Sequence, residues 1–106
     1  DVEAFLEKAT NVELQEQLAF NLLSYVPLAI RWAEDVVTDR ATDEAKLYVA
    51  LLTIANYTKR QPEKPLSEKL TETLESYVSA EELPMHCRRV AYDLQVTLEE
   101  RTASHE

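Results

Sequence analysis

The stretch Glu81–Arg89, with the sequence EELPMHCRR, gathers the residue types of this chain that most often do chemistry. It holds the single cysteine, Cys87, beside one of the two histidines, His86. A thiol next to an imidazole could serve as a nucleophile with its base. Glu82, four residues before His86, could share a metal ion with it on one face of a helix. Either use depends on the backbone that carries these side chains.

Helical geometry argues against both uses. Neighbouring side chains on a helix point about 100° apart, so His86 and Cys87 are not placed as a nucleophile and its base. Cys87 lies at the centre of an apolar stripe, where a free cysteine behaves as a small hydrophobic residue. Pro84 interrupts the spacing from Glu82 to His86, and the other histidine, His105, lies in the C-terminal tail. The sequence therefore predicts no catalytic residue and no metal site, with His86 on the flank of a helix.

The composition excludes further kinds of site. The chain contains no glycine, which removes the phosphate-binding loop, the dinucleotide-binding fingerprint and the nucleophile elbow of hydrolases. The glutamate pairs Glu81–Glu82 and Glu99–Glu100 lie near the two ends of one expected helix, whereas acid–base catalysis needs a carboxylate in a dry pocket. We therefore predict a protein without enzymatic activity and without a cofactor.

The charge balance limits the possible partners. The chain has 20 acidic and 11 basic residues, for a net charge of −9, whereas a nucleic-acid-binding surface needs clustered lysine and arginine. We expect no nucleic-acid binding. An acidic surface is compatible with a basic protein partner, although the same charge could simply keep the protein soluble.

The location of the protein is predicted from its apolar runs and its cysteine. The longest apolar run, Ala19–Ile30, contains Asn21 and Pro27 and is shorter than the roughly 20 residues of a membrane span. We therefore expect no membrane association. The lone Cys87 cannot form an intramolecular disulfide, which favours a cytoplasmic location over secretion.

The spacing of apolar residues and the absence of glycine predict an all-α fold. We expect an antiparallel bundle of four to five helices that forms a single domain over residues 1–106. The expected helices cover residues 1–9, 11–38, 43–59, 66–78 and about 79–102, and residues 102–106 are expected to form a frayed tail.

Capping residues and one proline set the expected helix limits. Pro27 lies inside the expected helix 11–38 and should kink it, with a break near Ser24–Val26 as the alternative. The expected N-terminal caps are Thr10 with Glu13, Thr42, and Ser79 with Glu82.

Each longer helix has an apolar stripe that predicts its core face. For the helix 11–38 the stripe consists of Leu14, Leu18, Leu22, Tyr25, Ala29, Trp32, Ala33 and Val36, and it is widened by Ala19, Leu23, Val26, Ile30 and Val37. For the helices 43–59 and 66–78 the core residues are expected to be Leu47, Tyr48, Leu51, Leu52, Ile54, Ala55, Leu66, Leu70, Leu74 and Tyr77. For the last helix they are expected to be Cys87, Val90, Ala91, Leu94 and Leu98.

The last helix carries a second apolar stripe on its opposite side. Met85, Tyr92 and Val96 align there with Arg89 between them, and methionine, tyrosine and arginine are enriched at protein interfaces. We predict that Met85, Arg89, Tyr92 and Val96 form a partner-binding surface. The alternative is that this helix is simply sandwiched inside its own bundle.

The sequence as a whole predicts a non-enzymatic, intracellular protein-interaction or regulatory domain. It would act through an apolar helix face with acidic flanks, either in self-association or with a basic protein partner. Phe20 and Tyr57 also lie off the main stripes of their helices and could extend such a surface. The alternative function is a small-molecule-binding or metal-binding bundle whose site, between the helices, is lined by Gln17, Asn21, Thr53, Asn56 and Gln95.

Overall fold

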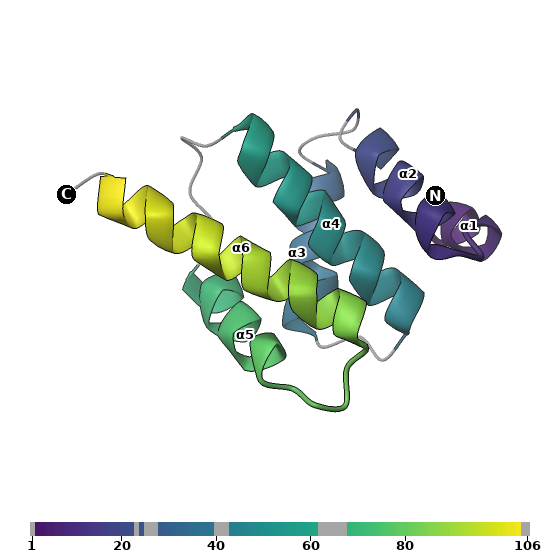
Figure 1. Cartoon of the computed structure of the whole chain (residues 1–106). Coiled ribbons are helices and arrows are strands. Elements are labelled where there is room, and N and C mark those ends of the chain that lie inside the picture. Colours follow the sequence, from purple (N-terminus) through teal and green to yellow (C-terminus); the bar gives the residue numbers. More distant parts are fainter. Residues whose placement is uncertain (1, 23, 25–27, 40–42, 62–67, 105–106) are drawn as a thin grey trace.

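The protein is all-helical in the residues that the computed structural model describes, which are 2–22, 24, 28–39, 43–61 and 68–104. These residues contain six α-helices and no strand. In chain order the helices are α1 (Val2–Lys8), α2 (Val12–Leu22), α3 (Leu28–Thr38), α4 (Glu44–Arg60), α5 (Glu68–Val78) and α6 (Met85–Ser104) (Figure 1). The all-α prediction is confirmed, with six helices in place of the four to five expected.

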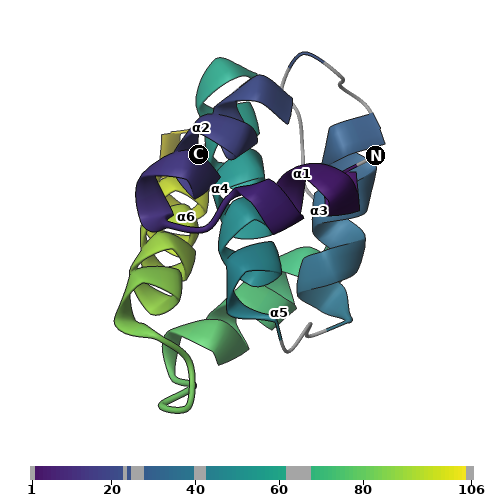
Figure 2. The same ribbon diagram turned by 90° about the vertical axis from the view of Figure 1, so that its right-hand side faces the viewer.

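Four of the helices form a ring around the main core. The contacting pairs are α3 with α4, α4 with α6, α6 with α5, and α5 with α3. Neighbours α4 and α6 run in the same general direction, from the lower right of Figure 1 toward the left and top. Helices α1 and α2 are added outside this ring, because α2 packs on α4 and α1 packs on α2. Figure 2 shows these two helices as a separate layer in front of α4.

Helix α4 is central because it has buried residues on several sides. Leu47, Leu51 and Ile54 belong to the main core, whereas Val49 packs with α2 and α3. The threonines Thr53 and Thr58 are also buried, and each hydroxyl donates to the carbonyl four residues earlier, at 2.8 and 2.9 Å. These bonds offset the cost of burying a hydroxyl group.

The long helix expected over residues 11–38 is wrong, because the chain forms two helices there. Helix α2 ends at Leu22 and α3 begins at Leu28. The alternative of a break is therefore confirmed, and α3 starts directly after Pro27 in the sequence. Proline is tolerated at a helix start but not in a helix interior. Pro27 itself, like Tyr25 of the expected stripe, lies outside the described residues.

The separation of α2 changes which of its sides is buried. Gln15, Ala19 and Leu22 are buried, whereas Leu14, expected in the core, is 38% exposed. Gln15 is accommodated because its Nε2 donates to the carbonyl of Ala9 at 3.2 Å, which ties α2 to the end of α1. Ala19 and Leu22 are buried and Leu18 is partly buried as expected, so the predicted core face of α2 is wrong at Leu14 and omits Gln15.

The expected caps of the second and third helices are corrected by one residue each. Asn11, rather than Thr10, caps α2, since its Oδ1 accepts the amide of Leu14 at 2.9 Å. Asp43 caps α4, and its Oδ1 accepts the amides of Ala45 and Lys46 at 3.0 and 3.2 Å. Thr42, the expected cap, lies outside the described residues. Asparagine and aspartate are among the strongest capping residues.

The last helix begins later than expected. Helix α6 starts at Met85, and the carbonyl of Pro84 accepts the amide of Arg88 at 3.1 Å, the first bond of the helix. The capping box of Ser79 with Glu82 is therefore wrong. The helix ends at Ser104 rather than Thr102, so within the expected tail only residues 105–106 lie outside the described residues.

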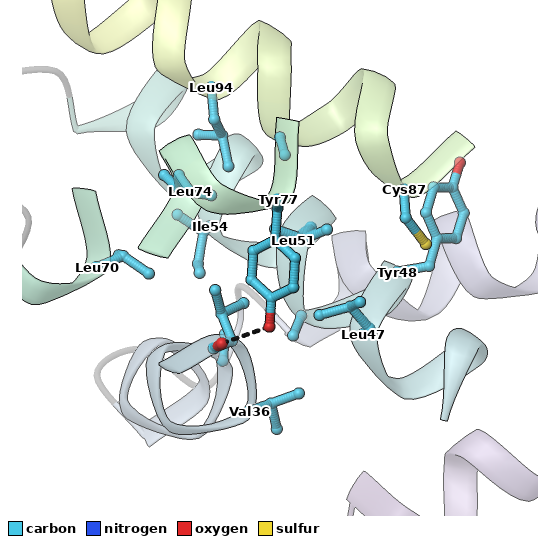
Figure 3. Close-up of a cluster of buried hydrophobic side chains, with 14 residues drawn as sticks. Val36, Leu47, Tyr48, Leu51, Ile54, Leu70, Leu74, Tyr77, Cys87 and Leu94 are labelled. Carbon is cyan, nitrogen blue, oxygen red and sulfur yellow. Dashed lines mark hydrogen bonds between the residues drawn. The ribbon is translucent and has the colours of Figure 1, made fainter. Parts of the chain in front are cut away.

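The main core confirms most of the predicted stripes (Figure 3). Buried members include Ala33, Val36, Leu47, Tyr48, Leu51, Ile54, Leu70, Leu74, Tyr77, Cys87, Ala91 and Leu94. Trp32, Leu52, Ala55, Val90 and Leu98 are partly buried against it, and Leu66 lies outside the described residues. The hydroxyl of Tyr77 donates to the carbonyl of Val37 at 2.6 Å and joins α5 to α3.

No helix in the described part of the chain combines the length and the apolar content that crossing a membrane requires.

Candidate functional site

The thiol of Cys87 is part of the core. Cys87 is fully buried, and its Sγ lies 4.0 Å from the carbonyl oxygen of Glu44 at the start of α4. Burial, and secondarily the charge of Glu44, raise the pKa of the Cys87 thiol to about 11. A neutral, enclosed thiol is a poor nucleophile, so the structure supports the interpretation of Cys87 as a packing residue.

His86 is held by an aromatic contact. Its ring meets the ring of Tyr48 edge to face, with the centroids 4.6 Å apart. The hydroxyl of Tyr48 donates to Oε1 of Glu16 at 3.1 Å. Burial, followed by this bond, raises the pKa of Tyr48 to about 12. Tyr48 thus connects α6 to α2 across α4, and His86 lies on the flank of α6 as expected.

Polar residues form no metal centre in the part of the chain that is described. No group of three or more histidine, cysteine, aspartate or glutamate side chains is close enough there to hold a metal ion. Among the residues proposed to line a site between helices, Thr53 is sealed in the core, whereas Gln17 and Asn21 line a surface hollow on α2. Asn56 and Gln95 are half-buried on α4 and α6.

The predicted partner-binding residues come together on the outer side of α6. Met85 is 72% exposed and Tyr92 is 55% exposed. Arg89 is exposed between them, and Val96 is half-buried. Their spacing of four, three and four residues keeps all four on one stripe of the helix. We call Met85, Arg89, Tyr92 and Val96 the α6 face. Its two largest apolar side chains are not sandwiched within the monomer.

The α6 face points outward because the opposite side of α6 is fixed on the core. Cys87, Ala91 and Leu94 are buried there. On the flank, Nη2 of Arg88 donates to the carbonyl of Val78 at the end of α5, at 3.5 Å, where a cation is favoured by the helix dipole. The Nε of Arg88 is buried and has no hydrogen-bond partner among the residues that the structure describes. These contacts set the rotation of α6.

A second exposed apolar region, which the sequence reading largely missed, lies in the N-terminal helices. Its exposed side chains are Phe5 (54%), Val12 (44%), Leu14 (38%), Phe20 (58%) and Leu28 (71%). Phe20 was the one expected surface residue among them. The available signal is that Phe20 lies off the predicted stripe of α2, whereas Leu14 was assigned to that stripe.

Two hollows adjoin α2 and share Asn21. One, of about 420 Å³, is lined by Glu13, Glu16, Gln17, Phe20 and Asn21. The other, of about 320 Å³, is lined by Phe5, Leu18, Asn21, Leu22 and Ser24. The guanidinium carbon of Arg60, at the end of α4, lies 5.1 Å from the centroid of the Phe20 ring, within the range of a cation–π contact. Both hollows have more apolar than polar lining, and the first alone carries carboxylates, those of Glu13 and Glu16.

Comparisons of the chain with protein-family models, with curated proteins and with solved structures found no match.

Proposed function

We propose that this chain is a non-enzymatic protein-interaction domain that binds a basic protein partner through the α6 face. The observation that carries the proposal is the exposure of Met85 and Tyr92 on one outward stripe, 72% and 55%. Large exposed apolar and aromatic side chains are the typical anchors of a protein interface. Arg89 lies between them and adds a planar group that can pair or stack.

Charge supports a basic partner rather than a second copy of the chain. Exposed acidic residues, Asp93, Glu99 and Glu100, lie on α6 around this stripe. The whole chain has a net charge of −9, so two copies repel each other, whereas a basic protein is steered toward the surface. Self-association is therefore the second form of the proposal.

The proposal also includes a cytoplasmic location, which the lone cysteine favours.

The test uses a matched pair of substitutions. Met85 and Leu28 are each the first residue of a helix, and they are 72% and 71% exposed. Aspartate is favourable in the first helical turn, so Met85→Asp and Leu28→Asp should both fold. We expect Met85→Asp and Tyr92→Ala to weaken partner binding about tenfold or more, and Leu28→Asp to leave it unchanged.

In the measurement, the chain and each variant serve as bait for affinity purification from an extract of the native source. The partner that is recovered is then titrated against the purified chain and against each variant. Sedimentation of the chain alone should give a monomer. Equal recovery and affinity with all three variants would refute the proposal, and a dimer that Met85→Asp dissociates would replace the basic partner with a second copy.

A further inference from the structure

The N-terminal helices carry five of the seven large hydrophobic side chains that are exposed in the described residues. Burial of apolar side chains is the dominant favourable term in folding and association. They lie on α1, α2 and the first residue of α3, and so on different helices from the α6 face. We call the residues that line the two hollows of α2 the α2 surface.

The two hollows of the α2 surface differ in charge. Phe5, Leu18 and Leu22 line one hollow, whereas the carboxylates Glu13 and Glu16 line the other beside Phe20. The hollows lie on different sides of α2 and both include Asn21, so a segment that crosses the helix over Asn21 can reach both. Such a segment would carry an apolar side chain close to a basic one.

A contact within the chain shows that a guanidinium group can lie over the ring of Phe20. The guanidinium of Arg60 lies over this ring, 5.1 Å from its centroid. Arg60 is itself exposed, so moving its side chain into water costs little. The Phe20 ring therefore already makes a cation–π contact with a guanidinium group in this protein. The carboxylates of Glu13 and Glu16 line the same hollow.

The charge of α2 points to a basic occupant. Its sequence, VELQEQLAFNL, contains Glu13 and Glu16 and no basic residue. Both carboxylates are exposed, and the whole chain has a net charge of −9. A second acidic copy of this chain is disfavoured at such a surface, and a basic segment is favoured.

We infer that the α2 surface docks a basic amphipathic segment of another protein. An arginine or lysine of that segment lies over Phe20 beside Glu13 and Glu16. A neighbouring apolar side chain enters the hollow of Phe5, Leu18 and Leu22. This inference concerns a surface separate from the α6 face and does not depend on the function proposed for that face.

The probe for the test is a synthetic peptide of leucine and arginine with amphipathic helical spacing. Its matched control carries glutamate in place of arginine. Binding of each labelled peptide to the whole chain is followed by fluorescence anisotropy at low salt. We expect the basic peptide alone to bind, with amide NMR shifts concentrated at residues of α1 and α2.

Four variants make the test specific. Phe20→Ala, and the pair Glu13→Gln with Glu16→Gln, should each weaken binding of the basic peptide about tenfold. Arg60→Ala removes the internal competitor for the ring and should tighten binding several-fold. Met85→Asp should leave it unchanged, which separates this surface from the α6 face.

The inference is overturned if the basic peptide does not bind, or if the acidic peptide binds equally well. It is also overturned if Phe20→Ala leaves the affinity unchanged, or if the amide NMR shifts are centred on α6. Loss of binding in Met85→Asp but not in Phe20→Ala would assign the peptide to the α6 face, and so support the proposed function alone. Dimerisation that Phe20→Ala abolishes would assign the α2 surface to a second copy. Circular dichroism confirms that each variant is folded.

Discussion

The ring of α3 to α6 and the layer of α1 and α2 differ in how fully they bury their apolar residues. Among the described residues, the ring encloses a cluster of 14 buried residues, most of them large. The cluster that joins the outer layer to the ring has four buried members in the same part of the chain, Ala19, Leu22, Ala29 and Val49. Two of these are alanines, which let helices approach closely but bury little area. Within the described residues, most large buried side chains therefore lie in the ring, and most large exposed apolar side chains lie in the layer.

The difference predicts that the two regions open at different free energies. A sealed core opens only with global unfolding, whereas thinly attached elements open at lower free energy. Polar contacts help to hold the layer in place: Gln15 to the carbonyl of Ala9, and Tyr48 to Glu16. The predictions below test this contrast, from the largest expected effect to the smallest.

Leu51→Ala should have the largest effect on stability. Leu51 is fully buried in the ring, and truncation of a buried leucine costs about 2–5 kcal/mol. Leu14→Ala is the matched change in the outer layer, where Leu14 is 38% exposed, and it should cost less than about 1 kcal/mol. Urea unfolding measures both values. Equal losses would remove the contrast between the two regions.

Alkaline pH should destabilise the ring through Cys87. Burial raises the pKa of this thiol from 9.0 to about 11, so the folded state favours the neutral thiol. The resulting stability is fully present below pH 9 and is lost as the pH rises toward 11, by about 3 kcal/mol in total. The measurement is urea unfolding across this range, with Cys87→Ala as the reference. Parallel curves for the two proteins would contradict the expectation.

Tyr77→Phe should remove a buried link between α5 and α3. The Tyr77 hydroxyl donates to the carbonyl of Val37 at 2.6 Å, in the last turn of α3, where carbonyls lack the amides of a following turn. Loss of the donor should cost about 1–2 kcal/mol. Tyr92→Phe, at an exposed tyrosine of α6, is the control and should be neutral in thermal unfolding. A neutral Tyr77→Phe would show that the ring does not depend on this bond.

Asp43→Ala should weaken the start of α4, the helix that both regions share. Asp43 accepts the amides of Ala45 and Lys46, and loss of such a cap costs about 1 kcal/mol. Asp43→Asn keeps an accepting oxygen and should restore most of the stability. Because both regions pack on α4, amide hydrogen exchange should accelerate in both. Acceleration in one region alone would contradict the shared role of this helix.

Tyr48→Phe should have the smallest effect and a local one. Its hydroxyl bond to Glu16 is partly exposed, so water can replace it and the loss should be about 0.5 kcal/mol. Amide exchange should increase in α2 more than in α6, because the lost bond joins α4 to α2. Glu16→Ala should give the same pattern, and the double variant should add nothing further.

The C-terminal half of the chain was the more predictable half. The stripe of Leu70, Leu74 and Tyr77 and the stripe of Cys87, Ala91 and Leu94 are buried as expected. Each belongs to one helix with one dominant neighbour surface, so apolar spacing alone identifies the core side. The exposed Met85 and Tyr92 were also found this way, because they lie opposite a buried stripe.

The N-terminal half was predicted less well because α2 and α3 are two helices rather than one. A stripe continued through Pro27 gives the right core side only if the helix is continuous. Because α2 and α3 are separate helices, the position of α4 decides which side of α2 is buried. That decision places Gln15 inward and Leu14 outward, and it places Phe5 and Phe20 beside hollows whose position no local pattern indicated.

The sequence by itself determined the helical class, the burial of Cys87 in the core, and the outward stripe on α6. These follow from the absence of glycine and from helical periodicity, which are local properties of the chain. Only the tertiary structure decided the division into a sealed ring and an open layer, the meeting of Tyr48 with His86 and Glu16, and the paired hollows on α2. These features require helices distant in sequence to be placed against each other, and periodicity carries no information about that placement.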